Sequence, residues 1–292
     1  MTRPLKIVVL AKQVPDTRNV GKDAMKADGT VNRAALAAIY NPEDLNALEQ
    51  ALTIKDLCAG STVTIVTMGP PRAADVIRES MFRGADGGIL VTDRKFAGAD
   101  TLATSYTLAA AIRKMGADVI VAGRQAIDGD TAQVGPQVAQ KLDLPQVTYV
   151  EEILDVCSDS ITIKRRLEHG VEVVKSPIPM VMTVGSSAPD CRPRIAKRVM
   201  KFKHARTVSE LQANAEDYYM TLRESREYLN ITGWGAADLD VDDQQLGLAG
   251  SPTKVKKIEN VVLSAKESKS LTSSEQDIAT MVQELVANHT IG

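Results

Sequence analysis

The sequence predicts an α/β protein built on a mostly parallel, doubly wound sheet. Apolar runs of strand length alternate with stretches that carry apolar residues at helical spacing in the first half of the chain. The run Ile7–Ala11 is apolar without interruption, which is typical of a strand buried on both faces. Further strands are predicted at residues 62–67, 88–91 and 118–122, and the stretches between them fit right-handed helical crossovers.

Helix starts are predicted between these strands. Asn41 is predicted to cap the first helix, with Pro42 at its first position and Glu43 and Asp44 near the positive end of its dipole. The remaining predictions are a helix through Val76 and Met81, a helix capped by Asp100 that contains Leu102, Leu108 and Ile112, and a helix from Thr131 through Val138.

The pattern changes after residue 145. Short strands joined by turns are predicted at residues 147–150, 160–164 and 171–174, followed by a buried strand at 179–184 and a basic helical stretch at 192–206. Residues 207–292 are polar, with glycine-rich turns at 233–235 and 247–250, and are predicted to form an arm beside an α/β domain of residues 1–206. An amphipathic helix is predicted at 274–287, with Ile278, Met281, Val282 and Leu285 on its apolar side.

The composition argues against several function classes. Lys plus Arg number 35 and Asp plus Glu number 37, so a net charge of -2 gives no support to nucleic-acid binding. Aromatic residues make up only 3%, which disfavours stacking on single strands. No apolar run approaches the roughly 18 residues of a membrane span, so we expect a cytoplasmic protein without membrane insertion.

Neither a metal centre nor a catalytic constellation is predicted. Cys58, Cys157 and Cys191 are far apart and form no CxxC pair. The three histidines are also scattered, whereas metal sites need clustered ligands. No Ser/His/Asp or Cys/His arrangement is visible, so no catalytic residue is assigned.

Two loops at strand ends are candidates for ligand binding, because open parallel sheets bind ligands outside the carboxyl ends of their strands. Residues 122–135 leave a strand, pass two glycines and enter a predicted helix, where backbone N–H groups suit a phosphate. Gln125 and Gln133 add amide donors. A plain turn capped by Asp130 or Thr131 is the alternative, and Asp128 and Asp130 would repel a phosphate unless they point away.

The segment 97–105 follows the same logic. It is a loop of small residues at a helix start, with Thr101 and Thr104 near the first turn. A helix cap at Asp100 alone would also explain it.

Several motifs together resemble the β-subunit of electron-transfer flavoproteins. They are Val9-Leu-Ala-Lys-Gln-Val-Pro-Asp16, Asn41-Pro-Glu-Asp44, Gly123-Arg-Gln-Ala-Ile-Asp-Gly-Asp-Thr-Ala-Gln133, Ile163-Lys-Arg-Arg-Leu-Glu-His-Gly-Val-Glu-Val-Val-Lys-Ser-Pro-Ile-Pro-Met-Val-Met-Thr183 and Leu246-Gly-Leu-Ala-Gly-Ser-Pro-Thr-Lys-Val255. One departure is His169, which stands where an acidic residue or glycine is usual.

The resemblance implies an adenine-nucleotide-binding α/β fold with a C-terminal arm that contacts an α-subunit carrying a mobile FAD domain. The implied cofactor-binding residues are Leu10, Ala11, Asn41, Asp44, Met68, Gly123, Arg124, Gln125, Asp128, Gly129, Asp130, Thr131, Gln133 and Val134, and the small-residue loop adds Thr101 and Thr104.

Two subtypes of the family differ in what this site holds. In one it holds structural AMP. In the other it holds FAD, which takes a hydride from NADH and divides the electrons between a low-potential acceptor such as ferredoxin and the FAD of the α-subunit. Residues 98–105 and 122–135 look more like this bifurcating subtype, because small residues leave room for a flavin and Arg124 suits a reduced, anionic one. Arg124 as a plain surface or phosphate contact is the alternative.

The family docks its dehydrogenase through a loop after a Pro-Arg pair, here followed by Ile195 and, further on, Val199. With Arg194 these residues are the predicted docking positions. The segment looks about two residues shorter than in members that meet acyl-CoA dehydrogenases and lacks their leucine, so a lactate-type 2-hydroxyacid dehydrogenase is an alternative partner. Lys201, Lys203 and Arg206 suit an acidic partner or simply form a solvated face.

An adenine-nucleotide sensor on the same scaffold is the competing class. It would explain the two loops but not the long second half of the chain. Trp234, Leu246 and Leu248 in the arm favour burial against another subunit.

Overall fold

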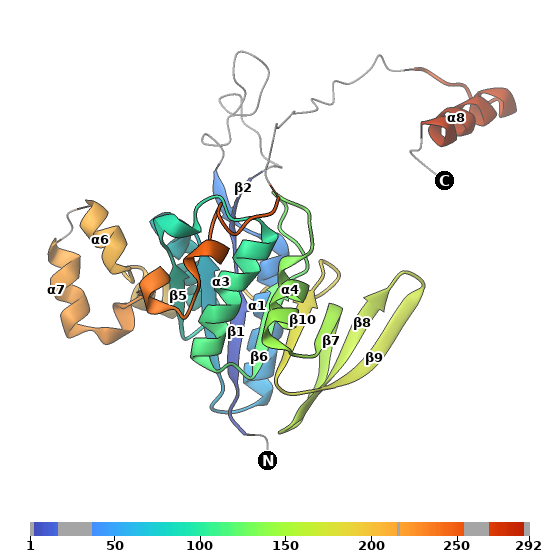
Figure 1. Cartoon of the computed structure of the whole chain (residues 1–292). Helices are drawn as coiled ribbons and strands as arrows, with labels where there is room; N and C mark the ends of the chain where they lie inside the picture. The colour runs from blue at the N-terminus through green and yellow to red at the C-terminus, as the bar shows by residue number, and fades with distance from the viewer. Residues whose placement is uncertain (1–2, 17–36, 215–216, 254–268, 289–292) are drawn as a thin grey trace, which may run out of the picture.

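The computed structural model describes residues 3–16, 37–214, 217–253 and 269–288. A nine-stranded sheet of order β11-β5-β4-β1-β6-β10-β7-β8-β9 forms the centre of the molecule (Figure 1). Its strands are β1 (Lys6–Leu10), β4 (Thr62–Met68), β5 (Gly87–Val91), β6 (Val119–Gly123), β7 (Gln146–Val156), β8 (Ser160–Leu167), β9 (Gly170–Pro177), β10 (Met180–Val184) and β11 (Thr232–Trp234). A separate hairpin pairs β2 (Gln13–Pro15) with β3 (Ala38–Tyr40).

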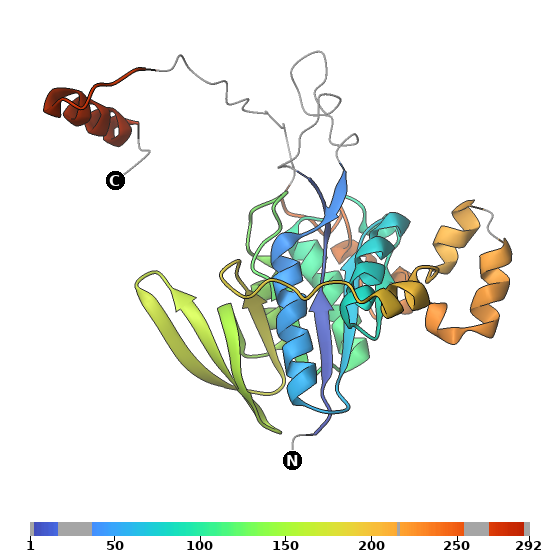
Figure 2. The same cartoon turned by 180° about the vertical axis from the view of Figure 1, so that it is seen from behind.

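The sheet is parallel from β11 to β7 and antiparallel beyond it. The central pairings place Val8 opposite Thr64 on one side and Ile120 on the other. Strands β7, β8 and β9 continue as a meander that extends to one side of the body (Figure 2). The predicted α/β class with a mostly parallel sheet is therefore confirmed.

The described residues form eight α-helices. They are α1 (Pro42–Leu57), α2 (Ala74–Arg83), α3 (Thr101–Met115), α4 (Val134–Leu142), α5 (Ala196–Phe202), α6 (Val208–Asn214), α7 (Asp217–Ser225) and α8 (Glu275–Ala287), with 3-10 turns at Pro71–Ala73, Arg94–Phe96, Glu227–Leu229, Ala236–Asp238 and Asp243–Gln245. Side chains of α1 and α2 pack on one face of the sheet and those of α3 and α4 on the other.

The alternation of side chains along β1 produces these two cores. Ile7 and Val9 belong to the cluster that contains α1 and α2, while Val8 and Leu10 belong to the cluster that contains α3 and α4. All four side chains are buried, as expected for a central parallel strand.

The predicted helix starts and caps are partly corrected by the structure. Asn41 precedes α1 but its side chain makes no capping hydrogen bond. The helix expected from Thr131 begins at Val134, because Asp130 and Ala132 adopt left-handed conformations with φ near +50°. The basic stretch 192–206 is helical only over Ala196–Phe202. The cap at Asp100 is confirmed by hydrogen bonds from the N–H groups of Leu102 and Ala103.

The segment after residue 206 contributes to the body of the molecule. Thr232–Trp234, predicted as part of a turn, instead pairs in parallel with β5 as an edge strand. Leu246 is buried within the chain itself, and Trp234 packs against the same core. The prediction that these two residues are buried against another subunit is therefore corrected. Leu248 is 58% exposed. The predicted amphipathic helix is present as α8, capped by Ser274.

Candidate functional site

A cavity of about 390 Å³ lies at the carboxyl ends of β1, β4 and β6. This is the position that the topology of an open parallel sheet favours for ligands. The lining residues are Leu10, Ala11, Lys12, Asp44, Val66, Met68, Ala99, Asp100, Thr101, Thr104, Leu108, Ala122, Gly123, Arg124, Gln125, Ala126, Gly129, Asp130, Thr131, Ala132, Gln133, Val134 and Gly135.

The lining of the cavity combines apolar and polar side chains. Strand ends and α3 supply the apolar side chains of Leu10, Val66 and Leu108. The hydroxyl of Thr101 donates to Oε1 of Gln133 at 2.9 Å, which links the first turn of α3 to the residue before α4. Such a lining suits a ligand that carries both an apolar ring and a charged group.

The N-terminus of α4 opens directly onto the cavity. The first N–H groups of a helix have no partner within it, and in α4 they belong to Val134 and Gly135, both of which line the cavity. Gln133, the residue before the helix, forms no side-chain cap. The corresponding groups of α3 are already satisfied by Asp100. Uncapped N–H groups at a helix start are suited to an anion such as a phosphate.

The start of α1 fastens the loops after β1 and β6 together. Asn41 donates from Nδ2 to the carbonyl of Gln125 at 2.9 Å, and its Oδ1 accepts the N–H of Ile127 at 3.2 Å. The carboxylate of Asp44 accepts the N–H of Lys12 at 2.8 Å and that of Gly123 at 3.1 Å. Asn41 therefore acts as a bridge between segments rather than as a helix cap.

Asp44 is a buried carboxyl group at the wall of this cavity. Burial, which disfavours the charged form, raises its pKa from 3.8 to about 7. Hydrogen bonds from Asn41 and from the N–H groups of Lys12 and Gly123 act in the opposite direction without cancelling the effect of burial. We therefore expect Asp44 to change its charge near neutral pH.

Arg124 lines the cavity but already has an anionic partner. Its Nη2 lies 3.1 Å from Oε1 of Glu43, whose side chain is only 8% exposed. The second oxygen of Glu43 accepts the N–H of Gln125 at 2.9 Å. The guanidinium also lies 5.6 Å from the ring centroid of Tyr149. These contacts hold Arg124 in place and offset part of its charge.

The two acidic residues of the loop after β6 are held by different partners. Lys12 donates to both carboxylate oxygens of Asp128 at 2.7 and 2.9 Å. Asp128 does not line the cavity, whereas Asp130 does and accepts a hydrogen bond from Gln125 at 3.1 Å. The concern that both carboxylates would repel a phosphate therefore applies to Asp130 alone.

Nearly all the cofactor-binding residues predicted from the sequence line this one cavity. The exceptions are Asn41 and Asp128, which contact the loops around it. The sequence reasoning missed Lys12, Val66, Ala99, Asp100, Leu108, Ala122, Ala126, Ala132 and Gly135. Most of these are apolar or small residues. Their position next to predicted residues in the same strand, helix or loop was the signal that could have identified them.

The predicted docking residues lie outside the cavity. Arg194 is exposed and its Nε donates to Glu79 at 2.8 Å. Ile195 is 47% exposed and its N–H donates to the carbonyl of Phe82 at 2.9 Å, next to the start of α5. Val199 is half-buried within α5. A role in docking stays a prediction for all three.

The described residues contain no cluster of three or more potential metal ligands. Among the helices of the same part of the chain, none is both long and apolar enough to span a membrane.

The fold and cavity define an α/β protein with a cavity suited to a small ligand at the carboxyl edge of a parallel sheet. A family model for the electron transfer flavoprotein domain matches residues 28–212. The chain is 44% identical over 255 residues to electron transfer flavoprotein subunit beta of Clostridium acetobutylicum, with 87% of each chain covered. The chain therefore belongs to the electron transfer flavoprotein family, as its motifs indicated.

Two further relatives come from differently named systems. The chain is 42% identical over 252 residues to the caffeyl-CoA reductase-Etf complex subunit CarD of Acetobacterium woodii, with 86% of each chain covered. It is 37% identical over 290 residues to protein FixA of Sinorhizobium fredii, with 97% of this chain and 92% of the relative covered. The second match extends the similarity across almost the whole chain.

Proposed function

We propose that this chain is the β-subunit of a bifurcating electron transfer flavoprotein and that its cavity binds FAD. In this proposal electrons pass from NADH to ferredoxin and, through an FAD in the α-subunit, to a flavin-dependent dehydrogenase of the acyl-CoA or lactate type. The observation that carries the proposal is the cavity itself, where the predicted loop residues meet the uncapped start of α4. The proposal includes a cytoplasmic location, where NADH and ferredoxin are available.

The donor set of the cavity fits an adenine dinucleotide. Val134 and Gly135 offer helix N–H groups to a pyrophosphate. Lys12 lines the same cavity, but its ammonium group is paired with Asp128, which offsets part of its charge. The apolar side chains of Val66 and Leu108 provide a surface for a ring. At Gly129 an added Cβ would meet no atom within 4 Å, so the loop leaves space for close approach of a ligand.

Arg124 supports a redox-active occupant. A bound FAD would supply an acceptor for the two electrons of a hydride. A cation beside it favours the reduced, anionic form. Glu43 at 3.1 Å reduces this effect, so the net field depends on the pair rather than on Arg124 alone. Tyr149 covers the guanidinium from another side.

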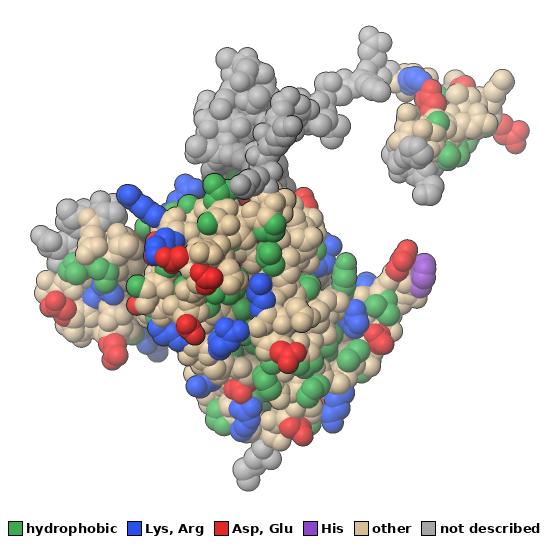
Figure 3. All heavy atoms as spheres, viewed as in Figure 1, with side chains coloured by type: hydrophobic (Ala, Val, Ile, Leu, Met, Phe, Trp, Pro, Cys, Tyr) green, Lys and Arg blue, Asp and Glu red, His purple; other side chains and the backbone are tan. Residues whose placement is uncertain are grey.

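An α-subunit partner is supported by the exposed apolar side of α8. Ile278, Met281, Val282 and Val286 are between 38% and 49% exposed, and Figure 3 shows hydrophobic side chains gathered on this helix. An apolar helix face of this kind is typical of an interaction surface. We therefore assign residues 207–292 to contact with the α-subunit, apart from β11 and Leu246, which pack within the chain.

Nucleotide content tests the proposal. The chain would be co-expressed with its α-subunit, the purified heterodimer denatured, and FAD and AMP quantified in the released material. Two FAD and no AMP per heterodimer are expected. One FAD and one AMP per heterodimer would contradict the bifurcating function and support a non-bifurcating subunit that holds a structural nucleotide. A chain that is stable alone and binds AMP reversibly would instead favour a sensor.

A further inference from the structure

A second cavity of about 580 Å³ lies between the β2–β3 hairpin, α1, α2 and the connections on either side of α5. We call it the basic cleft. Its charged lining residues are Asp75, Arg78, Glu79, Arg83, Arg194, Lys203 and Arg206. Five of these side chains are basic and two are acidic.

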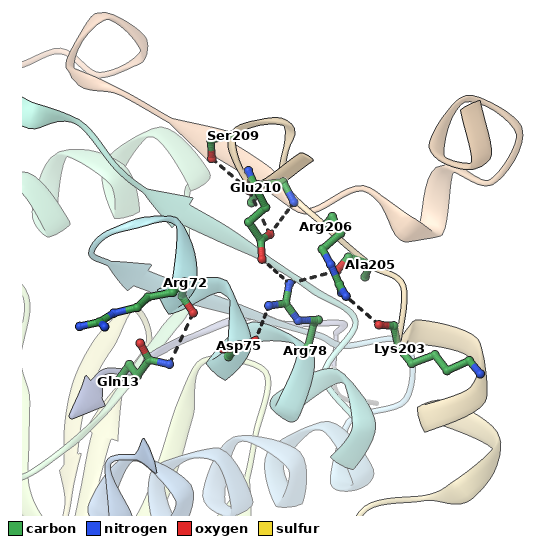
Figure 4. A network of polar contacts seen from close by, with 10 residues as sticks. Gln13, Arg72, Asp75, Arg78, Lys203, Ala205, Arg206, Ser209 and Glu210 are labelled. Carbon is green, nitrogen blue, oxygen red and sulfur yellow. Dashed lines mark hydrogen bonds and ion pairs between the residues drawn. The ribbon is translucent and has the colours of Figure 1, made fainter. Parts of the chain in front are cut away.

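The acidic side chains of the basic cleft are already paired. Asp75 contacts Arg78, which also lies 2.8 Å from Glu210, and Figure 4 shows the Arg78 guanidinium between these two carboxylates. Oε1 of Glu79 lies 2.9 Å from Arg83 and 2.8 Å from Arg194. These carboxylates hold three arginines in fixed positions and leave the remaining cations without a counter-charge.

Lys203 and Arg206 are those remaining cations. Within the described residues neither forms an ion pair with a carboxylate, since Arg206 donates only to the backbone carbonyls of Lys203 and Ala205 at 2.9 to 3.0 Å. Figure 4 shows the Lys203 ammonium group extending away from the network. Lys203 is exposed, so its ammonium group is accessible to an anionic partner. Arg206 is half-buried and one of its nitrogens is hydrogen-bonded to carbonyls, but its charge has no carboxylate partner among the described residues.

Apart from Gln13, the rest of the lining is formed by apolar and aromatic side chains. Ile39, Tyr40, Leu45 and Phe82 are all half-buried and come from β3, α1 and α2. The hydroxyl of Tyr40 is within 3.0 Å of that of Ser80, so its polar atom is satisfied while its ring contributes to the wall. A basic rim around an apolar floor suits a peptide that carries both an apolar side chain and carboxylates.

The basic cleft is continuous with the proposed docking segment. Arg194 lines it, and the next residue, Ile195, donates its N–H to the carbonyl of Phe82 in the cleft wall. Ile195 and Met200 extend an exposed apolar surface beyond the cleft, at 47% and 65% exposure. A small phosphate compound would use only the cations, whereas a protein segment would use the cations, the floor and this adjoining surface.

The basic cleft also shares a wall with the first cavity. Lys12 lines the first cavity and Gln13 lines the cleft. In the first turn of α1, Asp44 lines the first cavity and Leu45 lines the cleft. A segment bound in the cleft would therefore contact the residues directly behind those that line the nucleotide cavity.

We propose that the basic cleft binds an acidic segment of the partner dehydrogenase, with an apolar side chain on the floor and carboxylates against Lys203 and Arg206. This inference rests on the proposed function, because it requires a dehydrogenase partner. Charge complementarity of this kind raises association rates and depends on salt.

The test is steady-state electron transfer from the purified heterodimer to the dehydrogenase. The probes are purified acyl-CoA and 2-hydroxyacid dehydrogenases, and the one that the heterodimer reduces is used. Lys203→Glu is expected to raise the KM for the heterodimer about tenfold at low ionic strength, to weaken its salt dependence and to leave kcat unchanged. Ile39→Asp is expected to raise KM similarly. Lys175→Glu, an equal charge change at an exposed position of β9, is expected to have no effect.

The outcomes separate the two proposals. Unchanged KM and salt dependence in both cleft variants, with a raised KM in Ile195→Asp, would overturn the cleft inference and leave the docking segment in place. Unchanged KM in all three variants would remove the whole surface from docking. Loss of bound nucleotide in Lys203→Glu would assign the residue to the fold instead. A shift in the oligomeric state of the heterodimer, measured by sedimentation, would make a second copy the occupant.

Discussion

Gly123 packs against the carboxylate of Asp44 so closely that a side chain at position 123 would overlap it. The N–H of Gly123 donates to Oδ1 of Asp44 at 3.1 Å. A Cβ on residue 123 would lie 2.3 Å from the same oxygen and 2.8 Å from the backbone nitrogen of Asp44. The end of β6 and the first turn of α1 can therefore meet only where residue 123 has no side chain.

Replacing Gly123 with alanine is expected to lower the free energy of unfolding by about 1–3 kcal/mol, because the added methyl group overpacks a backbone contact. Urea unfolding measures the change. Gly129→Ala is the matched control, since its Cβ would meet nothing within 4 Å, and it is expected to stay within about 0.5 kcal/mol of the parent. Equal stabilities for the two variants would contradict this contact.

Asp44 predicts a dependence of stability on pH. Its pKa in the folded protein is raised by burial to about 7, above its ordinary value of 3.8, so folding favours the protonated form. The contribution is complete below pH 3.8 and is lost as the pH rises through about 7, by up to about 1.4 kcal/mol per pH unit. Asp44→Asn removes this contribution.

The measurement is urea unfolding of both proteins at pH 5, 6, 7 and 8. The parent is expected to lose stability relative to Asp44→Asn between pH 5 and 7, and the difference is expected to level off above pH 8. Asp240→Asn, at an exposed carboxylate, is expected to follow the parent. Parallel curves for the parent and Asp44→Asn would show that the buried carboxyl does not titrate in this range.

Gly129→Val is expected to abolish nucleotide retention while leaving the fold intact. The site of the new side chain is open, so the substitution adds bulk to the cavity lining without displacing protein atoms. Nucleotide released from the denatured heterodimer is quantified as before. Gly233→Val, at an equally open position in β11, serves as the control and is expected to retain the nucleotide. Full retention by Gly129→Val would remove this loop from the binding site.

Ile195→Asp is expected to raise the KM of the dehydrogenase reaction about tenfold, or roughly 1.4 kcal/mol, because it replaces an exposed apolar contact with a charge. Flavin content is expected to stay unchanged. The readouts are steady-state electron transfer and flavin quantified after denaturation. Leu167→Asp makes the same kind of change at a 43% exposed position in β8 and is expected to have no effect. If Ile195→Asp loses flavin, the segment is structural rather than a docking surface.

Much of the fold and cavity could be predicted because both depend on local pattern and on one topological rule. The apolar run of β1 identifies a central strand, and the carboxyl ends of parallel strands meet at one edge. Leu10, Met68 and Gly123 could therefore be placed together although they are distant in sequence.

The predictions that were wrong or missing share a different cause, which is that residues distant in sequence supply the interactions. Asn41 is of a residue type that often caps helices, but its side-chain amide forms hydrogen bonds with the backbone of Gln125 and Ile127 instead. Lys12 was overlooked because its partner, Asp128, is 116 residues away. β11 is three residues long and contains a glycine, so its strand character comes from pairing with β5 rather than from its own sequence.

The two cavities share a wall, so movement of that wall on binding in one cavity would alter binding in the other. Lys12 and Asp44 face one cavity while their neighbours Gln13 and Leu45 face the other. A partner that displaces this wall changes the affinity for nucleotide, and by reciprocity the nucleotide changes the affinity for the partner by the same factor. A heterodimer that has lost its nucleotide would then bind its dehydrogenase with a different affinity, so that the affinity for the dehydrogenase would depend on nucleotide occupancy.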